Sequence, residues 1–254
     1  MSTPASRYRR SGDRVSACCS SYGKLAGAQF DETVAKRDLE DYRKKGPGPT
    51  ARLLRDLLGD AGAVEGTLLD VGSGVGGLSF ELLERGVERA IAVDASAAYL
   101  AAAAQEATRR DRLRVVDFRQ GDFLDVASAI PPASIVTLDR VICCYPAFES
   151  LLTEALAHAE RYFAYSYPRD LWYVRAAIAG ENGLRRLKGN PFRAFVHPVK
   201  RMTEMIERGG FRLAGHRQTW QWSADVWVAG SAGNPISHGS TSSRRRTSRS
   251  VMRA

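Results

Sequence analysis

Two acidic residues on either side of a glycine-rich turn are the residues of this chain best suited to hold a small ligand. Residues 68–77 read LLDVGSGVGG, so that Asp70 precedes several closely spaced glycines, and Asp94 ends the apolar run RAIAVD. Glycine lets the backbone turn tightly and lets a ligand approach main-chain N–H groups without a Cβ in the way. Asp94 lies 22 positions after Gly72, about where a second-strand carboxylate meets a ribose diol in nucleotide-binding βαβ units. The pattern predicts a site for an adenosine-containing ligand.

The glycine spacing fits two kinds of ligand, and Asp70 separates them. Gly72, Gly74 and Gly77 match the dinucleotide pattern G-x-G-x-x-G, whereas Gly76 completes the alternative pattern G-x-G-x-G. A pyrophosphate next to Asp70 would be repelled, because both groups are negative. A ligand with an ammonium and a sulfonium would instead be attracted. We therefore favour a cationic nucleoside over a dinucleotide.

Two later strand-like runs also end in residues that can bind a ligand. Gly121, Asp122 and Phe123 follow the run LRVVDF, and Asp139 ends the run SIVTLD. A carboxylate next to an aromatic ring suits an adenine, because the carboxylate can accept from the amino group and the ring can cover the base. Open α/β folds bind ligands in the crevice outside the carboxyl ends of their parallel strands. We expect all of these strand ends to share one site.

The motifs LLDVGSGVGG, AIAVDAS, QGDFLD and TLDRVICCYP together resemble those of class I S-adenosylmethionine-dependent methyltransferases, over roughly residues 50–229. More loosely, the chain is similar to small-molecule methyltransferases around magnesium-protoporphyrin methyltransferase. The resemblance implies S-adenosylmethionine as cofactor and methyl transfer to a small-molecule acceptor by in-line displacement. It also implies a set of cofactor-binding residues: Asp70, Gly72, Ser73, Gly74, Gly76, Asp94, Ala95, Gly121, Asp122, Phe123 and Asp139.

The same resemblance assigns parts of the cofactor to these residues. Asp70 and the glycine backbone would hold the methionine moiety, and Asp94 would take the ribose hydroxyls. Asp122, with the ring that follows it, would meet the adenine. Asp139 and Arg140 would border the transferred methyl group.

The candidates for catalysis or for binding the acceptor are Tyr22, Arg140, Tyr145, Arg169 and His197. Tyr145 directly follows the fourth strand, near the point where transfer should occur. His197 could act as a general base, although a lone histidine before proline is more often structural. Arg169 could form a bidentate pair with an anionic acceptor, or a surface ion pair with Asp170 or Glu181.

A long segment between two expected elements predicts a cover for the site. Residues 167–198 separate a strand from a helix, where ordinary connections span about 2–6 residues. The segment mixes aromatic residues with arginines. We expect it to form a lid over the acceptor pocket, which residues 18–49 would cap from the other side. An extra helix pair that only extends the core is the alternative.

Alternating apolar runs and helical segments imply a doubly wound, mostly parallel α/β sheet. Thr50 is expected to cap a helix that reaches Leu58. The last two β runs, 211–220 and 224–230, can pair as antiparallel strands at one edge. The pattern alone predicts six or seven strands, and the resemblance implies a seven-stranded Rossmann-like sheet with an antiparallel edge strand. The other expected strands are 67–71, 90–94, 113–118, 135–139 and 162–166.

The net charge of +9 lies mostly near the two ends of the chain. Residues 1–17 carry +3 and residues 231–254 carry +5, which leaves about +1 for residues 18–230. We expect one methyltransferase domain at 18–230, between a disordered basic N-terminus and a disordered Ser/Arg-rich tail that lack the apolar residues needed to order themselves. Because the domain itself is near neutral, we do not expect a nucleic acid partner.

Other global features point to a cytoplasmic protein. There is no 18-residue apolar stretch, so no membrane span is expected, and the N-terminus lacks the apolar region of a secretory signal. The four cysteines form two adjacent pairs, Cys18-Cys19 and Cys143-Cys144, which predicts reduced thiols and no bound metal. Nothing in the sequence indicates an oligomeric state.

Three other functions fit parts of the pattern. An RNA methyltransferase would present a continuous basic face, and the chain has LDRVICCYP where many enzymes that methylate exocyclic amines have N/D-P-P-Y/F. An NAD-dependent oxidoreductase would need a second domain and a Tyr-x-x-x-Lys pair. A non-catalytic ligand-binding protein on the same fold is disfavoured by the intact glycines.

Overall fold

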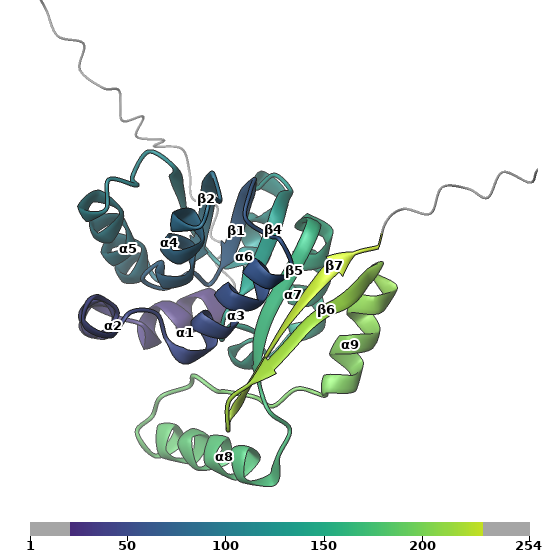
Figure 1. Cartoon of the computed structure of the whole chain (residues 1–254). Coiled ribbons are helices and arrows are strands. Elements are labelled where there is room, and N and C mark those ends of the chain that lie inside the picture. The colour runs from purple at the N-terminus through teal and green to yellow at the C-terminus, as the bar shows by residue number, and fades with distance from the viewer. Residues whose placement is uncertain (1–20, 231–254) are drawn as a thin grey trace, which may run out of the picture.

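The computed structural model describes residues 21–230 and contains one seven-stranded sheet (Figure 1). Five strands run parallel to their neighbours, β7 is antiparallel to β5, and β6 pairs antiparallel with β7 at the edge. The predicted fold class is therefore confirmed, with the reversed strand one place in from the edge. In chain order the strands are β1 (Thr67–Val71), β2 (Arg89–Asp94), β3 (Val116–Gln120), β4 (Ala133–Leu138), β5 (Ala159–Pro168), β6 (Phe211–Gln218) and β7 (Trp222–Ala229), and in the sheet they stand in the order β3-β2-β1-β4-β5-β7-β6.

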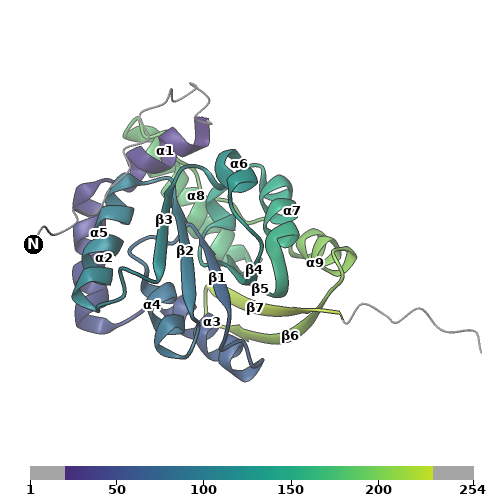
Figure 2. The ribbon, with the colours of Figure 1, turned by 90° about the horizontal axis from the view of Figure 1, so that it is seen from above.

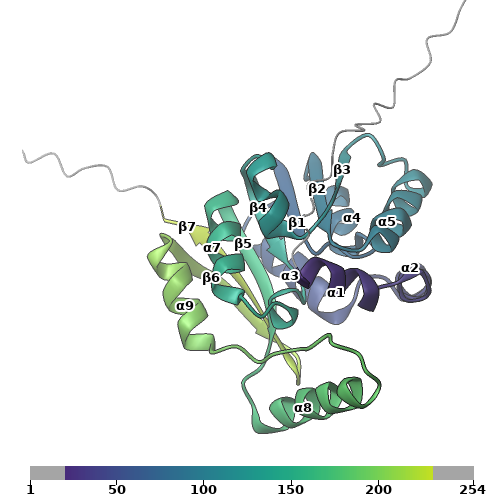
Figure 3. The same ribbon diagram turned by 180° about the vertical axis from the view of Figure 1, so that it is seen from behind.

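Helices cover both faces of the sheet. The helices are α1 (Ser21–Gln29), α2 (Glu32–Lys45), α3 (Pro49–Asp60), α4 (Gly77–Glu84), α5 (Ala97–Arg109), α6 (Phe123–Val126), α7 (Phe148–His158), α8 (Trp172–Leu187) and α9 (Val199–Arg208). Seen from above, α3, α4 and α5 lie on one face, and α6, α7 and α9 lie on the other (Figure 2). From behind, α7 and α9 lie over β5, β7 and β6, whereas α8 stands apart from the sheet (Figure 3).

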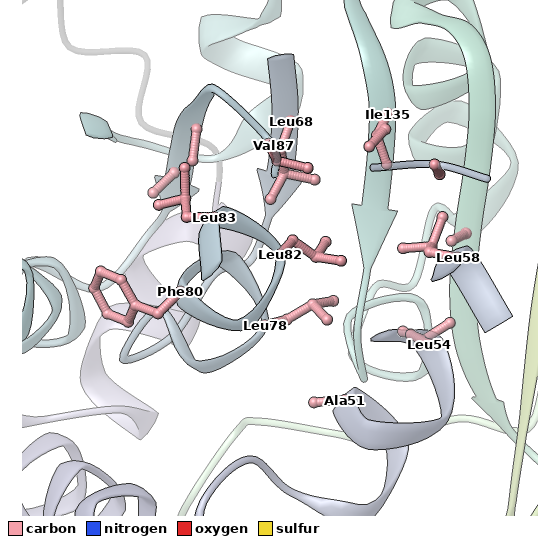
Figure 4. Close-up of a cluster of buried hydrophobic side chains, with 14 of the residues drawn as sticks. Ala51, Leu54, Leu58, Leu68, Leu78, Phe80, Leu82, Leu83, Val87 and Ile135 are labelled. Carbon is pink, nitrogen blue, oxygen red and sulfur yellow. The ribbon is translucent and has the colours of Figure 1, made fainter. Parts of the chain in front are cut away.

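The core on the α3–α4 face fixes the strand that leads into the glycine turn. Leu54 and Leu58 of α3 and Leu82 of α4 pack around Leu68 of β1 and Ile135 of β4, and all of these side chains are buried (Figure 4). Burial of such a side chain contributes about 1.5–3 kcal/mol. Strand β1 is thus held by α3 and α4 on this face of the sheet before the turn begins.

The structure corrects the predicted start of α3. The helix begins at Pro49, with Gly48 as the N-cap residue, so Thr50 is not the cap. Proline suits the first helical position, because its missing N–H would have no partner there. The Thr50 side chain is buried instead and hydrogen-bonds the Asp139 carboxyl.

Several predicted boundaries also move. The third strand begins at Val116 instead of residue 113, because a turn with Asp111 at φ +54° carries the chain out of α5, and Leu113 is exposed. The fifth strand begins at Ala159 instead of residue 162, directly after α7 ends at His158, because Ala159 already pairs with Ala133 of β4.

Some expectations fall outside the described residues. These are the disordered ends at 1–17 and 231–254, the first residues of the cap, and the pair Cys18-Cys19. Within residues 21–230, no helix combines the length and apolar character that crossing a membrane requires.

Candidate functional site

A cavity of about 950 Å³ lies at the carboxyl ends of β1, β2 and β4. Strand β1 stands between β2 and β4, where the strand order reverses, which is the position at which open α/β sheets bind ligands. Helices α1, α2 and α8 supply the outer walls. All of the predicted cofactor residues except Gly76 line this one cavity: Asp70, Gly72, Ser73, Gly74, Asp94, Ala95, Gly121, Asp122, Phe123 and Asp139.

The glycines of the turn differ in the space around them. Gly72, Gly74 and Gly76 have φ angles of +68°, +56° and +80°, a region that side chains disfavour. A Cβ on Gly72 would lie 2.4 Å from Val141, and a Cβ on Gly76 would lie 2.7 Å from Phe80, so packing requires glycine at both positions. A Cβ on Gly74 would meet no atom within 4 Å. Gly74 therefore borders open space that a ligand can fill.

Asp94 ties the turn to the end of β2. Its Oδ2 accepts from the Gly74 N–H at 2.8 Å, and its Oδ1 accepts from the Ser96 N–H at 2.8 Å. Burial raises the pKa of the Asp94 carboxyl to about 6, although these two hydrogen bonds act to lower it. Helix α5 is capped by Ser96, whose Oγ accepts from the Tyr99 N–H, so Asp94 is not the cap.

Two further carboxyl groups lie beside Asp94 in the cavity wall. Asp70 accepts from the hydroxyls of Ser79 at 2.6 Å and Thr137 at 2.7 Å, and burial raises its pKa to about 6. Asp139 accepts from a serine hydroxyl at 2.6 Å, and burial raises its pKa as well. Three acidic groups in one cavity attract a cation and repel a phosphate.

These features fit the cofactor that the sequence motifs imply. A sulfonium and an ammonium match the acidic wall, and the open space at Gly74 leaves room for the ligand next to main chain. The buried Ser73 Oγ has no hydrogen-bond partner among the described residues, as expected of an atom that bonds to a ligand.

Tyr145 is held against Asp122 in the cavity wall. Its hydroxyl donates to the two Asp122 oxygens at 2.8 and 2.9 Å, and its ring centre lies 4.2 Å from that of Tyr22. Burial, with the hydrogen bond to Asp122, raises the pKa of Tyr145, so the phenol keeps its proton at neutral pH. Asp122 also caps α6 by accepting from the Leu124 N–H. Phe123 is buried in the core and lines the cavity as well.

His197 does not line the cavity, contrary to its predicted role as a base. Its Nε2 lies 3.0 Å from the Ile142 carbonyl and 3.1 Å from the Tyr145 carbonyl. Carbonyl oxygens only accept, so Nε2 carries the proton and His197 holds the short turn between these residues. Burial lowers its pKa, which keeps the ring neutral. This placement agrees with the structural reading of a histidine before proline.

Arg169 also lies outside the cavity. Its Nη1 donates to the carbonyls of Thr219 at 3.2 Å and Trp220 at 3.3 Å. The acidic residues expected as alternative partners, Asp170 and Glu181, pair with other arginines. Arg169 therefore fixes the turn between β6 and β7 and pairs with neither Asp170 nor Glu181.

Arg140 does lie at the cavity, in an unusual backbone conformation. Its φ is +60°, a strained value for a residue with a side chain, of the kind that clusters at functional sites. Its guanidinium carbon lies 4.9 Å from the ring centre of Trp222, and it makes no ion pair with the other described residues. Trp222, a cavity residue that sequence reasoning missed, follows the β6–β7 turn and carries no local signal of its role.

Other missed wall residues come from the α1–α2 connection, from α2 and from α5. Phe30 stacks on Tyr99 at 5.3 Å between ring centres, and the Tyr99 hydroxyl donates to Asp38 at 2.7 Å. All three line the cavity. Phe30 and Asp38 belong to the predicted cap. Only the fold shows that Tyr99, in an alanine-rich helix, faces the cavity.

The cap and the lid meet over the site. Val174, Ile178 and Arg185 of α8 line the cavity. On the far side, the Asn190 amide donates to the side-chain oxygen of Gln29 at 2.8 Å. Phe192 packs edge-on against Phe30 in the same region. The cavity is therefore partly covered by two segments about 160 residues apart in the sequence.

Cys143 and Cys144 are free thiols at the edge of the cavity, with their sulfur atoms 3.5 Å apart. Residues 21–230 contain no group of three or more His, Cys, Asp or Glu side chains placed to hold a metal ion.

Fold and site together describe a class I methyltransferase: a doubly wound sheet with a reversed strand near one edge, and a glycine turn beside an acidic wall at its carboxyl end. A family model described as a methyltransferase domain matches residues 68–164. No match was found among curated proteins.

Solved methyltransferases have the same fold. Magnesium protoporphyrin IX methyltransferase from Synechocystis PCC 6803, with bound SAH, is 21% identical; the match has a TM-score of 0.64 and covers 82% of this chain and 100% of that one. An O-methyltransferase family protein from Burkholderia thailandensis is 13% identical, with a TM-score of 0.63 over 82% and 62% of the two chains. Human N-acetylserotonin methyltransferase, with SAM, is 16% identical, with a TM-score of 0.58 over 82% and 59%.

The family match identifies a methyltransferase domain at residues 68–164, and the fold of the chain is that of class I S-adenosylmethionine-dependent methyltransferases. Its cofactor is S-adenosylmethionine, which removes the NAD-dependent alternative.

Proposed function

We propose that this methyltransferase acts on a small-molecule acceptor, held between α8 and the connection from β4 to α7. The observation that carries the proposal is that the cap and the lid contact each other over the cavity and both contribute to its walls. Its volume of about 950 Å³ is near the upper end of the 300–1,000 Å³ typical of small-molecule sites. A folded nucleic acid would require an open basic groove instead.

In the proposed complex, Asp70 and the main chain at Gly74 hold the methionine part of the cofactor. Asp94 accepts from the ribose hydroxyls, for which its oxygens keep further acceptor capacity. Asp122 and Phe123 contact the adenine. The bound cofactor supplies a methyl group on a positively charged sulfur, which is a good leaving group.

The remaining task of the protein is to align the acceptor with that methyl group. Arg140 and Trp222 form the wall nearest Asp139, and the Arg140 guanidinium suits an acceptor that carries an anionic group. Tyr145 acts as a positioning residue, because its hydroxyl is held by Asp122 and its phenol stays protonated. Tyr22 covers the opposite side of the acceptor. An acceptor that arrives ionised, such as a carboxylate, needs no base.

The test uses cofactor with an isotope-labelled methyl group. The purified enzyme is incubated with a small-molecule extract, with total RNA, or with a mixture of the two. We expect label in the small-molecule fraction with wild-type enzyme and a strong reduction with the Asp94→Asn variant. Label found only in RNA would overturn the proposed acceptor class and leave the cofactor assignment intact. No transfer to either pool, with cofactor binding intact, would favour a non-catalytic ligand-binding role.

A further inference from the structure

The outer face of α8 exposes large apolar side chains in one place. Trp172 is 80% exposed, Leu184 54% and Leu187 87%, and Trp220 in the adjoining β6–β7 turn is 66% exposed. The other exposed large hydrophobic side chains in the described part of the chain are less exposed: Val64 at 42%, and Leu113 and Leu213 at 49%. A grouped set of this kind marks an interaction surface, whereas single exposed apolar residues do not.

Helix geometry makes these residues one stripe. At about 100° per residue, Trp172, Leu184 and Leu187 fall within an arc of about 120°, together with the small residues Ala176 and Gly180. Val174, which faces the cavity, lies on a different side of the helix. Helix α8 therefore has two apolar faces, of which only the inner one is explained by the methyltransferase site.

Helix α8, which carries the stripe, is fixed to the β6–β7 turn. Tyr173 stacks on Trp220, with ring centres 6.1 Å apart, and its hydroxyl donates to the Trp220 carbonyl at 2.7 Å. This contact joins α8 to the β6–β7 turn, which Arg169 also holds. Figure 1 shows α8 at the end of the molecule, away from the sheet. Trp172, Leu184, Leu187 and Trp220, which we call the outer α8 patch, can therefore contact a flat surface.

The charge around the patch is positive. Residues 169–193 contain six basic and two acidic residues, and the two acidic side chains, Asp170 and Glu181, are paired with arginines. Arg186 and Lys188 are exposed and form no ion pair within the described chain. A second copy would bring the same positive charge, and the arginine-rich C-terminal segment carries no acid that would neutralise it.

We propose that the outer α8 patch docks on the surface of an anionic lipid bilayer. Exposed tryptophans and leucines flanked by Lys and Arg are the combination that places an amphipathic helix in the interface of such a membrane. Tryptophan is enriched at that depth because its ring has both apolar and polar parts. Docking of this kind would bring the lid of the site to the lipid surface.

The test measures binding of the full chain to vesicles of phosphatidylglycerol and phosphatidylcholine by co-sedimentation. We expect binding that is stronger than to pure phosphatidylcholine and weakens with salt. The double variant Trp172→Glu/Leu187→Glu should reduce the bound fraction about tenfold. The matched control is Leu113→Glu/Leu213→Glu, which alters two exposed leucines elsewhere and should bind as wild type does. Circular dichroism and S-adenosylhomocysteine affinity, unchanged in both variants, show that the fold is intact.

Three results would overturn the proposal. One is equal vesicle binding by wild type and the patch variant. If the variant Arg244→Gln/Arg245→Gln/Arg246→Gln then abolishes vesicle binding, the tail is the lipid-binding segment. Another is the absence of a preference for anionic vesicles. The third is concentration-dependent self-association in the absence of lipid that the patch variant abolishes, because a second copy would then cover the patch.

Discussion

Asp94 holds two main-chain N–H groups, those of Gly74 and Ser96, before any ligand binds. A change at this residue therefore acts on the turn as well as on the ribose. Alanine would remove both effects together and leave two buried N–H groups without a partner, which costs about 1–3 kcal/mol each. Asparagine keeps the size of the side chain and one oxygen, and so reports more directly on ligand binding.

We expect Asp94→Asn to weaken S-adenosylhomocysteine binding by about 1.5–3 kcal/mol, the range for hydrogen bonds to a charged group. Isothermal titration measures this change. Thermal unfolding of the same variant should show a smaller loss of stability than Asp94→Ala does. If Asp94→Asn binds as tightly as wild type, Asp94 serves only to hold the turn.

Gly74→Ala should impair ligand binding much more than it impairs folding. The new Cβ would point into open space in the cavity, so the folded protein loses only about 1–2 kcal/mol from the left-handed backbone. Gly189→Ala is the matched control, because Gly189 has φ +69° and equal open space but does not line the cavity. Both variants should lose similar stability in chemical denaturation, and only Gly74→Ala should lose affinity. Equal affinities would place the ligand elsewhere.

At the scale of elements, the site is partly covered by contacts between the cap and the lid, both of which lie outside the sheet. The cap at α1 and the loop after α8 touch through Gln29–Asn190 and Phe30–Phe192. Because these contacts are few and partly exposed, we expect the cap and lid to open together more readily than the sheet unfolds.

Replacing Asn190 with alanine tests this coupling. The change removes the hydrogen bond to Gln29 and another within the lid, to the Phe192 N–H. We expect faster hydrogen exchange in both α1 and α8, with unchanged exchange in β1 and β4, and a higher KM for the acceptor. Gln29→Ala removes only the contact across the cavity and should reproduce the effect in α8. Faster exchange in the lid alone with Asn190→Ala would show that the two covers move independently.

At the scale of the whole molecule, the acidic wall makes stability and ligand binding depend on pH. Burial raises the pKa of Asp70 and Asp94 to about 6, above the ordinary value of about 3.9. The folded chain therefore holds these protons more tightly than the unfolded chain. The two carboxyl groups therefore contribute to folding stability in full below their unfolded pKa, and this contribution is lost as pH rises through about 6. Burial favours the protonated carboxyl groups, whereas a bound cation favours the ionised carboxylates.

S-adenosylmethionine should therefore bind more tightly as pH rises from about 5 to about 7, with little change above that range. Binding should release protons within this window, which titration calorimetry in buffers of different ionisation enthalpy detects. The Asp94→Asn variant should show a smaller release. Affinity that is constant or falls over the same range would mean that these carboxyl groups do not face the cation.

The sequence by itself determined the features that depend on neighbouring residues. The order of strands and helices, the glycine turn at Gly72 and Gly74, and the acidic strand ends follow from local patterns, and the structure places them as expected at one edge of the sheet. Because parallel strands bring their carboxyl ends together, residues as distant as Asp70 and Asp139 could be assigned to one cavity from the pattern alone.

Only the tertiary structure decided which side chains complete the site. His197 bonds to a carbonyl 55 residues away, and Arg169 to the turn at Thr219, so neither reaches the cavity. Trp222, by contrast, enters it beside Arg140. The physical reason is that a side chain's partners are set by the packing of distant segments, of which the local sequence carries no trace.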